Sequence, residues 1–591
     1  MIIILFFDFE VYKHDWLVVA IDPIKQNERV IVNNSQELID LYNEYKHDIW
    51  VGYNCRGYDV YILKAIMLGF NPKDVNDWII VKGRKGWEYS TLFNTIPLTF
   101  YDAMPNIPIS LKTLEGFIGN NIHETSVPFD INRKLTNKEL DETIEYCRFD
   151  VMNTIDVFLK RKNEFDSQMA LVKTFNLPLA HLGKTQAQLA AIILGAKRVK
   201  LKDEWDIRLP ECLNLGKYHN IGNWFVSKDS HDYEAKFETN IAGVPHTIAW
   251  GGLHGAKDKY IYECKPDEVF IMADVDQLYP TIMVKYGLLS RAVVEPKRFE
   301  HILSESLRLK ALKMKVEREP YKRICNITYG AEGDKFNPMY DPLHRNLVCV
   351  FGQVLMIDLI DKIEGFCQLI QSNTDGILVK IKRSDIPLLE AEIKKWEERT
   401  QLHMSMDEFT RVYQKDVNNY VIVDAKGDYK SKGAYVKELS DLDYDLPIVN
   451  EAVKEYLLTG KSVARTIYEC NDLRKFQKIV KLSSKYDWVE HEKGYNPWFG
   501  KRGKLNVGYN TSVKYDNKAY RVFASRDLND GRLLKCKMVN GIPKKDKFGN
   551  TPDSCFIDNG DIKDTTIPSK LDRDYYVDLA KKRLNDFGVE V

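Results

Sequence analysis

The chain has 591 residues, of which 44% are hydrophobic and 29% are charged. This length exceeds what one hydrophobic core can organise, so we expect several domains with the composition of a soluble globular protein. No apolar run approaches the roughly 20 residues of a membrane span, which argues against a membrane protein. The ten cysteines include no Cys-x-x-Cys pair. This pattern argues against a zinc ribbon or a disulfide framework and fits a reducing cytoplasm.

The formal net charge is zero, so composition alone does not indicate a nucleic-acid-binding protein. Balanced totals still allow a local basic surface. The segment from Arg308 to Arg323 contains seven Lys or Arg against two Glu. This segment is either a solvated helix face or part of a channel for a polyanion.

The pattern of residues 1 to 160 alternates strands with helical stretches, as in an α/β domain. Met1 to Phe7 is a short apolar run without a basic leader, and we interpret it as a buried strand and not as a signal peptide. Asn137 to Lys160 has a helical pattern. Residues 161 to 260 are mixed, and glycines cluster toward their end.

The second half of the chain has clearer local signals. Pro280 and Pro320 stand where helices can begin, because proline needs no N–H partner in a first turn. The Asn-Thr-Asp-Gly sequence at 373 to 376 is typical of a hairpin turn. The expected elements are a strand over Val269 to Asp274, a charged helix over Phe299 to Lys315, a hairpin over Phe366 to Lys382 and a helix over Leu446 to Leu458. The remaining C-terminal region is polar and mixed.

Two groups of acidic residues stand out, and the first lies in the N-terminal part. Residues two apart in a strand face the same side, so Asp8 and Glu10 present two carboxylates together while Phe9 turns to the core. Tyr146 and Asp150 are four apart and share a helix face, and Asp59 adds a carboxylate. Carboxylate oxygens suit Mg²⁺, and two such ions can hydrolyse a phosphodiester. Each pair alone could be an exposed strand edge or an ordinary helix face.

Together these residues resemble the proofreading exonucleases of the DEDD type that carry a tyrosine in their third motif. Asp8 and Glu10 match the first motif, and Tyr146 and Asp150 match the third. The second motif is matched by Asn54, Tyr58 and Asp59. Lys134 occupies a place where related phage enzymes carry a supporting lysine, although it could equally be a surface residue beside a helix.

The second acidic group lies in the C-terminal half. Asp274 ends an apolar strand, and Asp375 lies at the tip of the expected hairpin. If these strands are neighbours, the two carboxylates meet at one sheet edge, as a two-metal nucleotidyl transfer requires. Lys322, Asn326 and Tyr329 follow at i, i+4 and i+7 on one helix face, where a lysine can bind a triphosphate. An amphipathic surface helix is the alternative for that segment.

These features resemble the motifs of family B DNA polymerases, in order and spacing, from residue 1 to about residue 435. The matching segments are Asp274 through Thr281, Lys322-x-x-x-Asn326-x-x-Tyr329-Gly330, Asn373-Thr-Asp375-Gly376, Trp250-Gly251-Gly252 between the exonuclease and the polymerase, and the primer-strand element Lys415 through Tyr420. The final region matches only by position, as a thumb. The compact layout resembles bacteriophage replicative polymerases.

The resemblance implies a role for each residue. Asp8, Glu10, Asp59, Tyr146 and Asp150 would be catalytic in the exonuclease, and Asp274 and Asp375 in the polymerase. The metal ligands would be Asp8, Glu10, Asp59, Asp150, Asp274, Val275 through its main chain, and Asp375. The nucleotide contacts would be Tyr279, Arg308, Lys322, Asn326 and Tyr329. The DNA contacts would be Asn54, Tyr58, Trp250, Gly251, Gly252, Lys415 and Tyr420.

Four positions depart from the usual motifs. Asn373 replaces an acid, and Gln277, Ile327 and Gly376 each replace a serine. We expect these changes to alter nucleotide affinity and fidelity more than activity. Asp276 adds an acid two residues after Asp274, and we expect it to cap the following helix.

We therefore expect an α/β and α+β multidomain protein, with an RNase H-like exonuclease domain followed by a right-hand polymerase of palm, fingers and thumb. The expected ranges are exonuclease 1–165, connecting region 166–260, palm 261–292 and 331–435, fingers 293–330, and thumb with C-terminal region 436–591. The expected cofactors are two Mg²⁺ ions, or Mn²⁺, at each active site. Expected partners of this cytoplasmic monomer are primer-template DNA, dNTPs and a helicase, clamp-like or single-strand-binding protein. The alternative is a DEDD 3′→5′ exonuclease whose C-terminal half only binds DNA.

Overall fold

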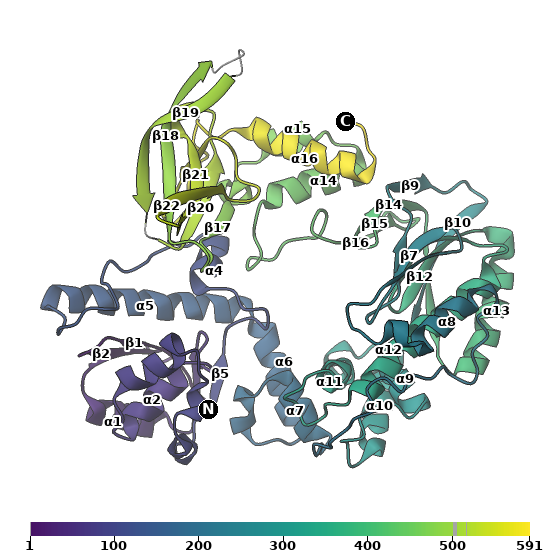
Figure 1. The fold of residues 1–591 in the computed structure, drawn as a ribbon, viewed down its shortest axis with the longest axis horizontal. Coiled ribbons are helices and arrows are strands. Elements are labelled where there is room, and N and C mark those ends of the chain that lie inside the picture. The colour runs from purple at the N-terminus through teal and green to yellow at the C-terminus, as the bar shows by residue number, and fades with distance from the viewer. Residues whose placement is uncertain (1, 500–504, 516) are drawn as a thin grey trace. The chain divides into compact units, whose positions relative to one another are not determined.

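The structure, a computed structural model, describes residues 2–499, 505–515 and 517–591 (Figure 1). It is a mixed α/β protein with five sheets in the described residues. The chain forms two compact units. Unit 1 contains Met1–Gly183, Glu438–Ala452 and Lys461–Leu579, and unit 2 contains Lys184–Lys437, Val453–Gly460 and Ala580–Val591. No helix among the described residues is long and apolar enough to cross a membrane.

The N-terminal part of unit 1 is built on a five-stranded sheet of order β3-β2-β1-β4-β5. Its strands are β1 (Ile4–Val11), β2 (Trp16–Asp22), β3 (Asn27–Val32), β4 (Ile49–Gly52) and β5 (Phe100–Asp102). β1 pairs antiparallel with β2 and parallel with β4. The helices are α1 (Ser35–Tyr45), α2 (Asp59–Met67), α3 (Pro72–Asn76), α4 (Leu111–Ile118), α5 (Asn137–Lys160) and α6 (Lys162–Thr174). The expected alternation of strands and helices, and the helix over Asn137 to Lys160, are confirmed.

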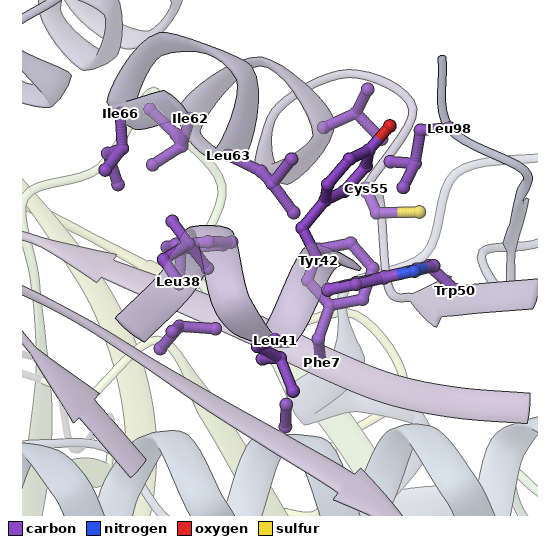
Figure 2. Packing of buried hydrophobic residues seen from close by; sticks show 14 of the residues in the cluster. Phe7, Leu38, Leu41, Tyr42, Trp50, Cys55, Ile62, Leu63, Ile66 and Leu98 are labelled. Atoms are coloured by element: carbon purple, nitrogen blue, oxygen red, sulfur yellow. The ribbon is translucent and has the colours of Figure 1, made fainter. Parts of the chain in front are cut away.

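The period-two pattern of β1 decides which side chains face which core. Phe7 and Phe9 point into one apolar cluster together with residues of α1 and α2, and Figure 2 shows Phe7 packed near Trp50 and Tyr42 in this cluster. Phe6 belongs to the opposite cluster, which includes Cys147 of α5. Asp8 and Glu10 have the same parity as Phe6 and therefore lie on the side of α5.

The C-terminal region of unit 1, residues 461–579, consists mainly of two antiparallel sheets. One contains β17 (Lys478–Lys481), β20 (Ala519–Ala524) and β23 (Cys555–Ile557); the other contains β18 (Trp488–Phe499), β19 (Leu505–Tyr515), β21 (Arg532–Val539) and β22 (Ile542–Lys547). Helix α15 (Val463–Glu469) precedes them, and α14 (Pro447–Thr459) and α16 (Arg573–Phe587) flank the region in the chain. The helix expected over Leu446 to Leu458 is confirmed as α14.

Unit 2 contains a seven-stranded sheet of order β13-β10-β12-β11-β8-β7-β6 and a four-stranded sheet of order β16-β15-β14-β9. The strands are β6 (Phe237–Ile241), β7 (Val244–Ile248), β8 (His254–Ala256), β9 (Tyr260–Glu263), β10 (Glu268–Val275), β11 (Gln368–Asn373), β12 (Gly376–Lys382), β13 (Met404–Phe409), β14 (Arg411–Asp416), β15 (Asn419–Val423) and β16 (Tyr429–Lys432). The predicted strand before Asp274 is β10, and the predicted hairpin is β11–β12; both are confirmed.

The helices of unit 2 are α7 (Gln186–Ile193), α8 (His219–Val226), α9 (Leu278–Lys285), α10 (Pro296–Ala311), α11 (Lys315–Glu332), α12 (Pro342–Ile363) and α13 (Ile386–Thr400). Eighteen of the 22 residues of α12 are buried, as expected for a helix that is apolar around most of its circumference. Pro280 lies in the first turn of α9. The prediction that Pro320 begins a helix is wrong, because α11 starts at Lys315 and continues through this proline.

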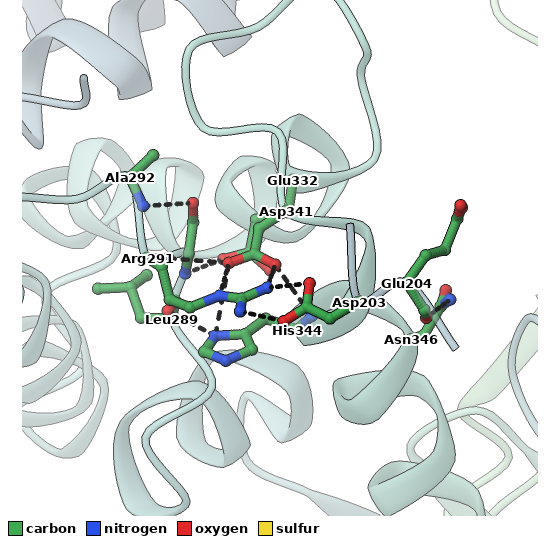
Figure 3. Close-up of polar contacts among 10 residues, drawn as sticks. Asp203, Glu204, Leu289, Arg291, Ala292, Glu332, Asp341, His344 and Asn346 are labelled. Atoms are coloured by element: carbon green, nitrogen blue, oxygen red, sulfur yellow. Dashed lines mark hydrogen bonds and ion pairs between the residues drawn. The ribbon is translucent and has the colours of Figure 1, made fainter. Parts of the chain in front are cut away.

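An ion-pair cluster around the buried Asp341 ties the segment around Asp203 to the start of α12 (Figure 3). The guanidinium of Arg291 donates to both oxygens of Asp341, at 2.9 and 2.7 Å, and reaches Asp203 at 3.1 Å. Asp341 is fully buried and also accepts from the N–H of His344 in the first turn of α12. Arg291 therefore compensates a buried carboxylate that also caps a helix.

Arg291→Ala should lower the free energy of unfolding by about 2–4 kcal/mol, because Asp341 would keep a buried charge without its partner. The matched control is Lys395→Ala. Lys395 pairs with Glu392 on an exposed surface, and its loss should cost less than about 1 kcal/mol. Chemical denaturation of the two variants measures the difference. Equal effects would show that the buried cluster is not a major source of stability.

Candidate active sites

Three carboxylates meet in unit 1 between β1 and α5. Asp8, Glu10 and Asp150 each offer an oxygen, and these oxygens lie within 4.8 Å of one another. Asp59 is buried at the start of α2 and accepts a hydrogen bond from the N–H of Phe9 at 3.2 Å. The structure thus brings together residues that lie up to about 140 positions apart in the chain. The predicted pairing of Asp8 with Glu10 on one side of β1 is present.

Lys112 is a member of this site that the sequence analysis missed. Its ammonium group contacts Asp150 and donates to Glu115 at 3.1 Å, and it lies 4.6 Å from the ring centre of Tyr146. Lys134, the lysine suggested by the sequence, is exposed. Lys112 lies on α4, and only the packing of α4 beside α5 shows that it belongs to the site. No spacing in the sequence signals that contact.

The site concentrates negative charge in a dry environment. Burial, followed by repulsion between the carboxylates, raises the pKa of Asp8 and of Glu10 well above the usual range. Burial raises the pKa of Asp59 to about 7, and it raises the pKa of Asp150 against the opposing effect of Lys112. Burial also raises the pKa of Tyr146, which keeps the phenol protonated and able to donate a hydrogen bond.

The donor set fits divalent metal ions. Four carboxylates converge, and the charge of Lys112 opposes the raised pKa of both Asp8 and Glu10. Hard oxygen ligands of this kind are those that Mg²⁺ and Mn²⁺ prefer. Asp8, Glu10, Asp59 and Asp150 would hold the ions, and the ions would relieve the repulsion that raises the pKa values.

Metal-free protein should reveal this repulsion through its pH dependence. Burial raises the folded-state pKa of Asp59 to about 7, from its ordinary value of 3.8. Its protonated form is therefore favoured by folding, and this stabilisation is lost as the pH rises through 7. In EDTA, Asp59→Asn should be more stable than wild type at pH 8, by an amount on the order of a few kcal/mol, and close to wild type at pH 4. Thermal unfolding at both pH values tests this, and a stability difference that does not change with pH would contradict it.

Asn54 and Tyr58, the other two residues of the predicted second motif, precede α2 in the chain. The main-chain N–H of Asn54 donates to Asp102 at 2.9 Å, and Asn54 has φ of 58°, which asparagine tolerates better than most residues. The hydroxyl of Tyr58 donates to Asn76 at 2.8 Å. Burial and then the charges of Asp59, Glu10 and Asp8 raise the pKa of Tyr58. Tyr58 therefore lies near the carboxylates, and its contact with DNA stays a prediction.

A second carboxylate pair lies in unit 2. β10 pairs antiparallel with β12 so that Asp274 stands opposite Gly376, and the N–H of Val275 donates to the carbonyl of Asp375 at 2.7 Å. Asp274 and Asp375 therefore lie side by side at one sheet edge, as the sequence analysis expected if the strands were neighbours. Burial and then the charge of Asp375 raise the pKa of Asp274 to about 6. These two acids and the main chain of Val275 would hold metal ions here.

Steric crowding at this sheet edge explains why residue 376 is a glycine. A Cβ atom at this position would lie 1.9 Å from Oδ1 of Asp274 and 2.9 Å from the carbonyl of Ala273. A serine, which the related motif usually has, would displace the Asp274 carboxylate from its present position. The glycine therefore keeps the two strands close together beside the acidic pair.

A pocket of about 200 Å³ opens next to Asp375. Tyr279 and Tyr329 form its aromatic wall, with ring centres 4.4 Å apart. Asn326 and Thr374 add polar groups. The predicted helix-face partners Asn326 and Tyr329 therefore meet Tyr279 at one pocket.

Other predicted nucleotide contacts lie outside the residues that line this pocket. Lys322 is partly exposed on α11. Arg308 is exposed on α10 and pairs with Glu305 of the same helix at 2.6 Å. Two helices are present here as α10 and α11, with bounds that differ from the predicted ones, and the roles of Lys322 and Arg308 stay predictions.

The Trp250-Gly251-Gly252 segment borders the same pocket. The carbonyl of Gly251 accepts from the hydroxyl of Tyr279 at 3.4 Å. A Cβ at Gly252 would lie 1.9 Å from Oγ1 of Thr374, so this close approach requires glycine. Trp250 packs against an aromatic group that includes Trp205, with ring centres 5.2 Å apart.

The predicted primer-strand element lies on β14 and β15. Lys415 pairs with Asp416 at 2.5 Å and lies 5.3 Å from the ring centre of Tyr435. Tyr420 is buried, and burial and then the charge of Asp274 raise its pKa. Tyr420 is thus placed near the acidic pair, whereas contact with DNA stays a prediction for both residues.

Asp276 does not cap α9, so that prediction is wrong. Gln277 is the residue before the helix, and no side chain caps it. The carboxylate of Asp276 instead contacts Lys310 of α10 and accepts from Ser405 at 2.9 Å. The ion pair with a neighbouring helix competes successfully with the local capping interaction.

No protein-family model matches the chain, and none of the curated proteins matches it. Among solved structures, the chain is similar to the family B DNA polymerase from the hyperthermophilic archaeon Pyrobaculum calidifontis. The identity is 16% and the TM-score is 0.41. The similarity covers 99% of this chain and 77% of the archaeal chain. At this degree of likeness, the function has to be argued from the two carboxylate sites themselves.

Proposed function

We propose that this protein is a template-directed DNA polymerase that also carries a 3′→5′ proofreading exonuclease. The observation that carries the polymerase is the pairing of β10 with β12, which sets Asp274 beside Asp375. Asp375 also lines a pocket together with Tyr279, Asn326 and Tyr329. A nucleotidyl transfer needs two such acids next to a site for the incoming nucleotide. Two helices, α10 and α11, lie between β10 and β11 in the chain and would form the fingers.

The separate cluster in unit 1 supports the exonuclease. Its acids come from a strand and from two helices around a sheet of order β3-β2-β1-β4-β5, an arrangement that fits an RNase H-like domain. Tyr146 stands on α5 one turn before Asp150. Divalent ions bound at either site would activate the attacking oxygen and neutralise the phosphate charge.

The side chains of the chain itself would orient the reactants. In unit 1, the protonated phenol of Tyr146 would donate a hydrogen bond that positions the attacking water, and Lys112 would hold Asp150. In unit 2, the aromatic wall of Tyr279 and Tyr329 would pack against the sugar and base of the incoming nucleotide. The substrates would be primer-template DNA and dNTPs, and the compact layout suits a phage replication enzyme.

The alternative, an exonuclease whose C-terminal half only binds DNA, requires Asp274 and Asp375 to lie apart. Their positions on paired strands favour the polymerase. A labelled primer annealed to a longer template separates the two functions. We expect extension when dNTPs and Mg²⁺ are present and shortening when dNTPs are left out. Shortening under both conditions would support the alternative.

Tyr279 should select the sugar of the incoming nucleotide. It lines the pocket beside Asp375, where its ring can exclude a ribose 2′-hydroxyl. Tyr279→Val should raise ribonucleotide incorporation relative to deoxyribonucleotide incorporation by about 10-fold or more, since a removed steric contact is worth 1–3 kcal/mol. Competition between rNTP and dNTP in single-nucleotide extension measures this. Unchanged selectivity in an active variant would leave Tyr279 with a packing role only.

A further inference from the structure

Helix α4 carries Lys112 but is short. It spans eight residues, Leu111–Ile118, which is too few for a helix that is stable by itself in water. Lys112 in its first turn contacts Asp150 of the exonuclease cluster. Whatever holds α4 in place therefore also determines where this lysine lies.

The C-terminal region, residues 461–579, holds the opposite end of α4. Carbonyl groups at a helix C-terminus lack partners within the helix. Here every main-chain carbonyl from residue 116 to residue 120 accepts a hydrogen bond from the C-terminal region. The donors are the side chains of Arg521 to Gly116 (3.3 Å) and to Asn120 (2.6 Å), of Gln477 to Phe117 (3.1 Å) and of Arg474 to Ile118 (3.1 Å), and the main-chain N–H of Ile562 to Gly119 (3.0 Å). All these donors lie more than 350 positions later in the chain.

Arg521 is the centre of this contact. Its side chain is fully buried, and its five N–H donors make five hydrogen bonds. One goes to Gly116 of α4 and one to Asn120 just after the helix, and the other three go to Gln477 at 3.1 Å and to the carbonyls of Asp558 and Gly560. Within the described part of the chain no carboxylate forms an ion pair with it. Burying a cation without a carboxylate partner costs free energy. The five hydrogen bonds of Arg521 offset this cost and join several main-chain carbonyls at one place.

Apolar packing also holds α4 against the C-terminal region. A Cβ at Gly116 would lie 2.7 Å from Cδ1 of Ile479, so glycine allows α4 to approach β17 closely. Leu114, Phe117 and Ile118 share one buried cluster with Ile479 and Ala519 of the C-terminal region. The region therefore buries one face of α4 and satisfies its carbonyls, while the first turn of α4 faces the carboxylates.

We infer that the C-terminal region is an accessory element of the exonuclease site, in which Arg521 is a positioning residue that fixes α4 and, through it, Lys112. This inference rests on the proposed exonuclease. It assigns to residues 461–579 a role in primer shortening that a thumb serving only the polymerase would not have.

Arg521→Gln tests the inference, with Arg526→Gln as the matched control. Arg526 is exposed, and its side chain makes a long contact of 3.5 Å with Tyr468. We expect Arg521→Gln to shorten a primer at least about 10-fold more slowly and to extend it within about twofold of wild type, since only the first activity depends on α4. Arg526→Gln should match wild type in both. Hydrogen exchange at residues 111–119 should rise only in Arg521→Gln. A folded Arg521→Gln with unchanged shortening and exchange would overturn the inference.

A double-mutant cycle with Lys112→Ala identifies the route. If Arg521 acts through Lys112, the double variant should shorten primers no more slowly than Lys112→Ala alone. If the rate decreases of the two single variants multiply in the double variant, Arg521 does not act through Lys112. If Arg521→Gln does not fold, two other variants replace it. Arg474→Gln removes the bond to Ile118 together with an ion pair to Asp441, and Arg521→Lys keeps the charge; both should give intermediate exchange and shortening. If wild type shortens no primer, the proposed exonuclease fails, whereas hydrogen exchange still tests whether Arg521 fixes α4.

Discussion

Asp274→Ala and Asp375→Ala should each abolish primer extension while primer shortening continues near the wild-type rate. Each substitution removes a carboxylate from the pair that β10 and β12 hold side by side. Losing a metal ligand at such a site removes several kcal/mol of transition-state stabilisation, which corresponds to a rate decrease of about 10³-fold or more. Extension of a labelled primer under single-turnover conditions measures the loss.

Glu408→Ala is the matched control for this pair. Glu408 lies on β13 next to β10 and pairs with Arg383 at 3.1 Å, and it is not part of the acidic pair. It should extend primers within a few-fold of wild type. If Asp274→Ala were folded and still extended primers normally, the polymerase site would have to lie elsewhere in the chain.

Asp8→Ala combined with Glu10→Ala should produce the reverse result. Primer shortening should fall by about 10³-fold or more, because two of the carboxylates that would hold the ions are lost. Extension should stay within a few-fold of wild type, since β1 belongs to unit 1 and the Asp274–Asp375 pair to unit 2. Degradation of a single-stranded oligonucleotide without dNTPs measures the first effect.

Glu28→Ala serves as the control for this double variant. Glu28 lies on β3 of the same sheet and pairs with Arg148 at 2.7 Å on a more exposed face, away from the cluster. It should shorten primers normally. Loss of both activities in the Asp8 and Glu10 variant as well as in Asp274→Ala would mean that one site performs both reactions, which contradicts the assignment of two sites.

Local patterns in the sequence predicted much of this arrangement. The alternation in β1 placed Asp8 and Glu10 on one side, and the i, i+4 spacing placed Tyr146 with Asp150 on α5. The turn sequence at Asn373 to Gly376 predicted the hairpin that carries Asp375. These signals succeed because strand and helix periodicity is a local property of the chain.

Features that depend on tertiary packing were not predictable. Lys112 joins the carboxylates only because α4 packs beside α5, and the ion pair of Asp276 with Lys310 overrides the local preference for a helix cap. The hydrogen bonds from Arg521 to the carbonyls of Gly116 and Asn120 connect positions about 400 residues apart. No spacing rule links residues at that separation.

The fate of a mismatched primer end tests the central claim most directly. Wild-type protein with Mg²⁺ and all four dNTPs should first remove the mismatched nucleotide and then extend the corrected primer to the end of the template. Asp8→Ala with Glu10→Ala should leave the mismatch in place and extend it slowly, and Asp274→Ala should remove it without extension. If wild-type protein extended the mismatch without removing it, or removed it and never extended, the account of one chain with two cooperating active sites would be contradicted.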